Sequence, residues 1–200
     1  MSRLRAGVAA AVVSVALIGG PGAASARQGP DNIVEVQNTR DGSLRARSQA
    51  VVTHSPGGDV TNNNVATATS SCVNCRTAAA AVQMLIVEGA YDQATFAPWN
   101  LGVAVNQNCD TCETFAYAHQ IVFIVLRPVK IGARASDQIE SIQKDIDDVV
   151  RSRDDFPTMQ AELDSLTDQM AGVVRSEIDR SGHGRGEQDH RDVHEREGQH

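Results

Sequence analysis

The sequence predicts an α+β fold in which three consecutive antiparallel β-hairpins precede an acidic helical hairpin. Two segments that share the pattern C-x-x-C-x-T-x-A-x-A-x-Q begin at Cys72 and Cys109, and beyond the cysteines they agree at alternate residues, which is the period of a β-strand. An Asp-Gly dipeptide, typical of tight turns, separates an earlier pair of alternating limbs. Residues 136–180 instead carry apolar side chains three and four positions apart, the spacing of amphipathic helices.

Residues 1–26 have the composition of a secretory signal peptide. Arg3 and Arg5 supply a positive start, residues 6–18 form an uncharged apolar segment, and residues 24–26 read Ala-Ser-Ala, a cleavage motif. No later segment reaches the roughly 20 apolar residues that a spanning helix needs. We therefore expect a secreted or cell-surface protein with no membrane span once the signal has been cleaved.

The first expected hairpin spans residues 32–53 and turns at Asp41 and Gly42. Valines alternate with polar residues before the turn, and apolar residues alternate with Arg and Gln over residues 44–52 after it. The Pro-Gly-Gly sequence that begins at Pro56 ends this hairpin.

The repeat supplies the second and third hairpins of a β-domain that spans residues 27–134. Short alternating limbs, residues 64–69 and 100–106, lead into the two C-x-x-C segments, and the cysteine pairs take the place of the turns. Beyond the cysteines one face of each long limb is constrained and the other differs between the copies. The constrained face holds Thr77 and Thr114, Ala79 and Ala116, Ala81 and Ala118, and Gln83 and Gln120. We expect hydrogen bonds between neighbouring units to explain its threonines and glutamines.

Residues 135–180 are expected to form the helical hairpin, with Ser136 as the cap of its first helix. Its apolar stripes, which lie within residues 136–180, either pack on the β-domain or form a seam for a protein partner. Residues 181–200 contain Val193 as their one apolar residue and are expected to be a disordered tail.

The charge distribution narrows the choice of partners. The chain has a formal net charge of −7 at pH 7, and residues 135–200 hold 17 acidic and 8 basic residues. Because no basic face is present, nucleic acid is not an expected partner.

Cys72, Cys75, Cys109 and Cys112 are the candidate site residues. An even number of cysteines in an exported chain favours structural disulfides, and three connectivities are open. Paired C-x-x-C segments also form four-cysteine zinc sites, and the same spacing occurs in thioredoxin-type redox motifs. No catalytic residue is assigned, since the chain contains neither HExxH nor GxSxG.

The limb from Asn100 to Asn106, followed by the C-x-x-C-x-T-x-A-x-A-x-Q segment at Cys109, resembles a group of exported actinobacterial proteins of unknown function with a duplicated C-x-x-C. It is also similar to the C-terminal segment of proteins classed as peptide zinc metalloproteases. The resemblance covers about residues 32–128. It implies export and a repeat domain, and it carries over no catalytic residue because the protease HExxH is absent here.

We therefore expect an exported, non-catalytic binding or structural module that is stapled by its cysteine pairs, with no cofactor. The alternatives are a thiol–disulfide oxidoreductase and a zinc-binding accessory factor.

Overall fold

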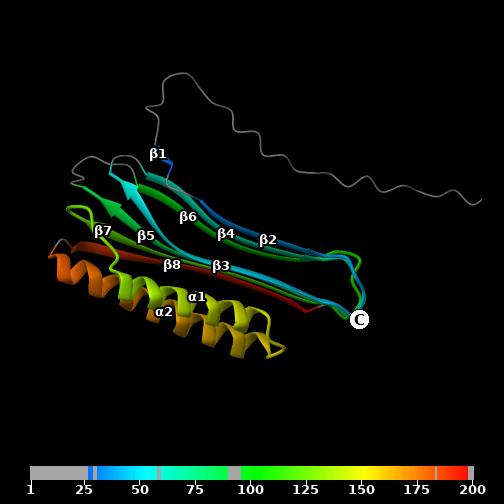
Figure 1. Ribbon diagram of the computed structural model, residues 1–200. Helices are drawn as coiled ribbons and strands as arrows, with labels where there is room; N and C mark the ends of the chain where they lie inside the picture. The colour runs from blue at the N-terminus through cyan, green and yellow to red at the C-terminus, as the bar shows by residue number, and fades with distance from the viewer. Residues whose placement is uncertain (1–26, 29–30, 58–59, 90–95, 183, 198–200) are drawn as a thin grey trace, which may run out of the picture.

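The computed structural model describes residues 27–28, 31–57, 60–89, 96–182 and 184–197 and shows an α+β fold of three layers (Figure 1). The predicted signal peptide, residues 1–26, lies outside the described residues. One outer layer, sheet A, contains β1 (Arg27–Gln28), β2 (Asn32–Asn38), β4 (Val60–Ser70) and β6 (Phe96–Asn106). The middle layer, sheet B, contains β3 (Leu44–Pro56), β5 (Arg76–Glu88), β7 (Glu113–Val125) and β8 (Gly184–Glu197). The helices α1 (Ala133–Val150) and α2 (Phe156–Ser181) form the third layer.

The prediction of three antiparallel hairpins is wrong in its pairing. In sheet A, β2 pairs in parallel with β4 and β4 with β6. In sheet B, β3 pairs in parallel with β5 and β5 with β7. The two limbs of each unit therefore lie in different sheets and are joined by an arch, so that their side chains, not their backbones, face each other. Each unit, called a rung below, hydrogen-bonds to the equivalent residues of the next rung.

The predicted alternation is confirmed, and it has a direct physical meaning in this arrangement. The face of sheet B that repeats between the copies points toward sheet A. One apolar cluster between the sheets is built from small side chains, namely Val34, Ala66, Ala68, Ala79, Ala81, Ala104, Ala116 and Ala118. Because these side chains are short, the two backbones can approach closely, and a larger residue in any rung would disturb its neighbours.

A buried asparagine ladder runs through this core. Asn32 Nδ2 donates to Asn64 Oδ1 (2.7 Å), and Asn64 Nδ2 donates to Asn100 Oδ1 (2.7 Å). The ladder also ties the sheets together, since Asn64 Nδ2 donates to the Ala81 carbonyl (3.0 Å) and Asn100 Nδ2 to the Ala118 carbonyl (2.9 Å). Equivalent asparagines therefore fix the register of the rungs.

The predicted hydrogen bonds between neighbouring units are also confirmed. Gln120 Nε2 donates to Gln83 Oε1 at 2.7 Å. The Ser70 hydroxyl lies 2.6 Å from the hydroxyl of Thr77 and 2.8 Å from that of Thr114. All of these polar side chains are buried and need partners. The Ser70–Thr114 and Gln120–Gln83 contacts join neighbouring rungs, whereas the Ser70–Thr77 contact joins the two limbs of one rung.

The two predicted helices are confirmed, and they lie side by side against sheet B (Figure 1). Their apolar stripes enter the main core and pack against sheet B. The helical part of that core consists of Ile139, Ile142, Ile146, Val150, Phe156, Met159, Leu163, Met170, Ala171, Val174 and Ile178.

The helix ends differ from the expectation at one position. Ser136 does not cap α1, because the helix begins earlier and its N-cap is Gly132, which has no side chain to accept a hydrogen bond. In α2 the Asp155 carboxylate accepts from the Thr158 N–H (2.7 Å), and these hydrogen bonds hold the pKa of Asp155 below its ordinary value. Gly182 ends α2 with φ of 67°, a left-handed conformation that glycine adopts without strain.

The prediction of a disordered tail is wrong for Gly184–Glu197, which form β8. This strand pairs antiparallel with β7 along its length. Polar composition alone argued for disorder, but the outer edge of β7 carries N–H and C=O groups that need partners. Backbone pairing of this kind does not depend on apolar side chains, so composition does not reveal it.

Candidate functional site

The three arch turns, residues 39–43, 71–75 and 107–112, stack at the end of the molecule where the two sheets meet (Figure 1). Gly42, Asn74 and Thr111 have φ values of 65°, 52° and 53°. The left-handed region suits glycine, is tolerated by asparagine and is rare for a β-branched threonine. The repeated backbone path is held by hydrogen bonds between turns, such as Asn74 N–H to the Asp110 carbonyl (2.8 Å).

The stacked turns bring the four predicted cysteines together. Cys72 is bonded to Cys75 and Cys109 to Cys112, with Cα–Cα distances of 6.1 and 5.8 Å, so each disulfide closes one turn. Cys72, Cys75 and Cys112 are buried, and Cys109 packs against them. Of the three connectivities, the structure therefore has the local one, and no free cysteine occurs among the described residues.

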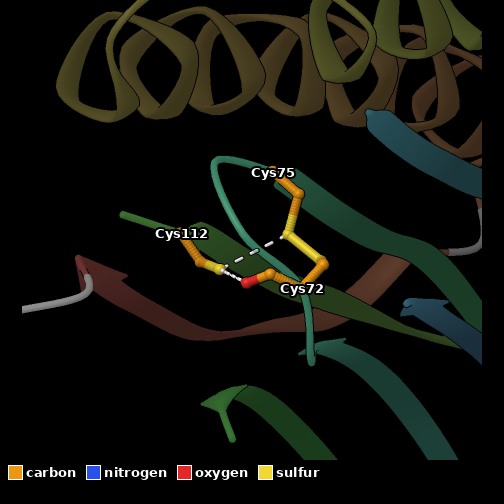
Figure 2. A group of neighbouring side chains, drawn as sticks. All are labelled: Cys72, Cys75 and Cys112. Carbon is orange, nitrogen blue, oxygen red and sulfur yellow. Dashed lines mark hydrogen bonds between the residues drawn. A yellow bond between two sulfur atoms is a disulfide. The ribbon is translucent and has the colours of Figure 1, made fainter. Parts of the chain in front are cut away.

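The two disulfides lie against each other, as Figure 2 shows for three of the cysteines. Cys75 Sγ is 3.4 Å from Cys112 Sγ, and Cys112 Sγ is 2.8 Å from the Cys72 carbonyl oxygen. The sulfurs of Cys72, Cys75 and Cys112 all lie within 4.8 Å of one another. This spacing results from the register, since each cysteine stands next to its counterpart in the adjacent rung.

The first rung has no cysteines, and a polar clip takes their place. Arg40 and Ser43 occupy the positions of Cys72 and Cys75. The Ser43 hydroxyl lies 2.6 Å from the Arg40 carbonyl oxygen and 2.9 Å from Asn38 Oδ1. The same turn therefore closes with hydrogen bonds in one rung and with disulfides in the other two.

Arg76 is the cation closest in sequence to the cysteines, and its guanidinium is engaged elsewhere. It donates from Nη1 to Glu113 Oε2 (2.8 Å) and from Nη2 to the Asp154 carbonyl. It also lies over the Phe156 ring, 4.5 Å from the centroid. Its contacts therefore attach α2 to the end of the sheet rather than stabilise a thiolate at Cys75.

A second polar cluster, between β7, α2 and β8, was missed by the sequence analysis. The Tyr117 hydroxyl lies 2.8 Å from His119 Nδ1 and 3.3 Å from the Thr167 hydroxyl, and it donates to Asp164 Oδ1 (3.0 Å). Arg191 of β8 donates to Asp164 Oδ2 (2.6 Å). The only sequence signal was that this copy has Tyr and His where the other copy has small apolar residues.

Burial raises the pKa of the Tyr117 phenol above its ordinary value of 10.0; the Thr167 hydrogen bond lowers it in part and the Asp164 carboxylate raises it further. Tyr117 therefore remains a neutral donor, and the cluster fixes α2 and β8 to β7. His119 is buried in this cluster.

Trp99 lies in β6 on the outer face of sheet A and is 59% exposed.

No protein-family model, curated protein or solved structure matches the chain. Within the described residues, no helix combines the length and apolar character needed to cross a membrane.

Proposed function

We propose that the protein is an exported, non-catalytic binding or structural module whose cysteines lock the turns of a parallel β-stack. The observation that carries this proposal is the position of the two disulfides, which are packed against each other and joined into the turn-to-turn hydrogen bonding. Disulfides of this kind persist in oxidising compartments, which agrees with the signal-like residues 1–26. Export and the resemblance to exported repeat proteins remain parts of the proposal.

The surroundings of the sulfurs favour this function over a thiol–disulfide oxidoreductase. A catalytic C-x-x-C needs an accessible thiolate, stabilised by a helix N-terminus or a nearby cation. Here both pairs lie in arch turns between strands, three of the sulfurs belong to buried residues, and Arg76 is bound to Glu113.

The first test counts thiols in the secreted protein. Alkylation before reduction should add no mass, and alkylation after reduction should modify all four cysteines. A chain that is alkylated without reduction would contradict structural disulfides.

The second test separates a structural from a catalytic role. The wild-type chain should not accelerate insulin reduction by a dithiol. The double variant Cys72→Ser with Cys75→Ser should be less stable, and insulin reduction in its presence should also proceed at the rate of the dithiol alone. Turnover well above the dithiol alone, lost in this folded variant, would instead assign the oxidoreductase function.

A zinc-binding accessory factor is the second candidate, because Cys72, Cys75 and Cys112 place their sulfurs within 4.8 Å of one another. Ligands of one tetrahedral zinc ion, with Zn–S bonds of about 2.3 Å, lie about 3.8 Å apart. An external dithiol would first have to reduce each disulfide to two thiols, and would itself be oxidised, before the cysteines could bind zinc. Native mass spectrometry of the reduced chain with zinc tests this: one bound zinc, lost when Cys109 and Cys112 are replaced by Ser, supports the candidate, and no zinc removes it.

A further inference from the structure

The two ends of the parallel stack differ. At the end of the third rung, β7 is covered by β8. At the end of the first rung, β2 pairs only with β4 and β3 only with β5 among the described strands. β3 has 13 residues, as many as β5 and β7. A full-length strand edge therefore remains open here, and we call this end of the stack, formed by β2 and β3, the open edge.

The buried side chain of Asn32, at the open edge, is the first member of the asparagine ladder. Asn64 and Asn100 each accept a hydrogen bond on Oδ1 from the asparagine of the preceding rung. Asn32 has no preceding rung, and although its side chain is buried at 1% exposure, its Oδ1 has no hydrogen-bond partner. A buried acceptor without a donor carries a desolvation cost. A donor at the position of a preceding rung would remove this cost.

Arg45 and Arg47 lie at the open edge. In the next rung their register positions are held by Thr77 and Ala79, which face sheet A and are fully buried. The two arginines are instead exposed, and neither forms an ion pair with a described residue. Positions that hold small, buried side chains inside the stack therefore hold long, charged side chains at its end, and these have no ion-pair partner in the described part of the chain.

The two arginines line a hollow of about 410 Å³ between β2 and β3. Glu35 and Arg151 also line it, and Arg151 already pairs with Asp147 at 2.6 Å. The hollow therefore combines an open strand edge with an excess of positive charge.

A second copy of the chain does not complement this end. Two open edges placed together would bring Arg45 and Arg47 against the same residues of the other copy. A copy added by its third rung would have to release β8, and it would bury the arginines against Thr114 and Ala116, which offer no carboxylate. Charges at an edge strand commonly prevent such self-pairing.

We infer that the open edge binds an extended acidic segment of a partner protein, which adds to sheet B as a further strand beside β3. Carboxylates at alternate positions would face Arg45 and Arg47 and form charge-assisted hydrogen bonds. An Asn or Gln opposite Gln49 would donate to Asn32 Oδ1, since Asn32 Nδ2 already lies 3.3 Å from the Gln49 carbonyl oxygen. The open edge would therefore recognise a segment in which two acidic residues and one Asn or Gln occupy every second position. The inference rests on the proposed function as a binding module.

The probe is a synthetic peptide as long as β3, in which Val and Thr alternate with Glu, Glu and Asn. Its control has Lys in place of both Glu residues. Fluorescence anisotropy with the oxidised full-length chain should show binding of the Glu peptide and not of the Lys peptide. Amide hydrogen exchange should slow in β3 on binding and stay unchanged in β7.

The charge-swapped chain, R45E with R47E, supplies the matched comparison. It should bind the Glu peptide about tenfold more weakly or worse, because two charge-assisted hydrogen bonds are lost, and it should now bind the Lys peptide. Both arginines are exposed, so its circular dichroism and melting temperature should match those of the wild type.

Three results would overturn the inference: no binding of the Glu peptide, equal binding of both peptides, or protection that lies outside β3. A concentration-dependent dimer of the chain alone that the charge swap abolishes would assign the open edge to a second copy instead. Thiol counting and insulin reduction do not involve this edge. A failed peptide experiment with a fully oxidised, redox-inactive chain therefore rejects the strand partner and leaves the module proposal standing.

Discussion

In β5 and β7 the two faces of sheet B are equally buried, but only one of them repeats between the copies. Toward sheet A, β5 and β7 carry the same residues at every register position from Thr77 with Thr114 to Gln83 with Gln120. Toward the helices, the paired residues differ, as Ala78 with Phe115 and Ala80 with Tyr117. Burial alone therefore does not explain which positions repeat.

The difference lies in what covers each face. The inner face meets a second repeating sheet, so the second and third rungs have the same small space and equivalent hydrogen-bond partners. The outer face meets two helices that do not repeat, so each rung packs against a different surface. Identity between repeats indicates a repeating neighbour, and variation indicates a neighbour that occurs once.

The largest effect is expected on the helix-facing side. Phe115→Ala should destabilise the fold by about 3–5 kcal/mol, because it removes a buried ring that stacks on Phe156 at 5.2 Å. Phe115→Leu should cost under about 1.5 kcal/mol, since this face tolerates changes of shape. Urea unfolding measures both. Equal losses in the two variants would show that this face is as strict as the inner one.

Breaking the asparagine ladder should have the next largest effect. Asn64→Ala should cost about 2–4 kcal/mol, because the Ala81 carbonyl and Asn100 Oδ1 both lose a donor inside the core. The neighbour Asn63 faces outward and bonds to the exposed Asp31, so Asn63→Ala should stay within about 0.5 kcal/mol. Similar melting temperatures for the two variants would remove the ladder as a source of stability.

Two adjacent alanines compare the faces directly. Ala80 and Ala81 are both fully buried, Ala80 toward the helices and Ala81 toward sheet A. Ala81→Leu should cost about 1–3 kcal/mol, the usual range for overpacking, and Ala80→Leu should cost less because α1 and α2 can adjust. A greater loss for Ala80→Leu in thermal unfolding would reverse the proposed distinction.

The smallest effect concerns the polar cluster on the helix-facing side. Tyr117→Phe should cost about 1 kcal/mol, the value of a typical hydrogen bond. The raised pKa of Tyr117 gives a signed pH dependence: its contribution to stability is complete below pH 10.0 and falls as the pH rises further, because the unfolded chain ionises first. Stability curves between pH 8 and 11 should therefore decline less steeply in Tyr117→Phe than in the wild type, and parallel curves would contradict this.

Much of the fold follows from the sequence, and the strand pairing does not. A period of two identifies strands and their faces, but it is the same in an antiparallel hairpin and in a parallel stack. The distinguishing signal was the recurrence of asparagine at 32, 64 and 100, the same place in the first limb of each unit, since such side chains form a ladder when parallel rungs stack in register. The cysteine neighbourhood followed from the repeat. The Tyr117 cluster did not, because its partners Asp164 and Thr167 lie 47 and 50 residues away.

The order of events during folding follows from the arch architecture. Pairing between rungs joins residues about one repeat apart, such as Asn32 with Asn64, and sheets built from such distant contacts form slowly. The bonded cysteines, by contrast, are 3 residues apart, so their loops close at little entropic cost in an otherwise unfolded chain. Oxidation can therefore fix the conformation of two of the three turns before any rung pairs with the next. The slow step, strand pairing between rungs, then begins with fewer conformations open to those turns.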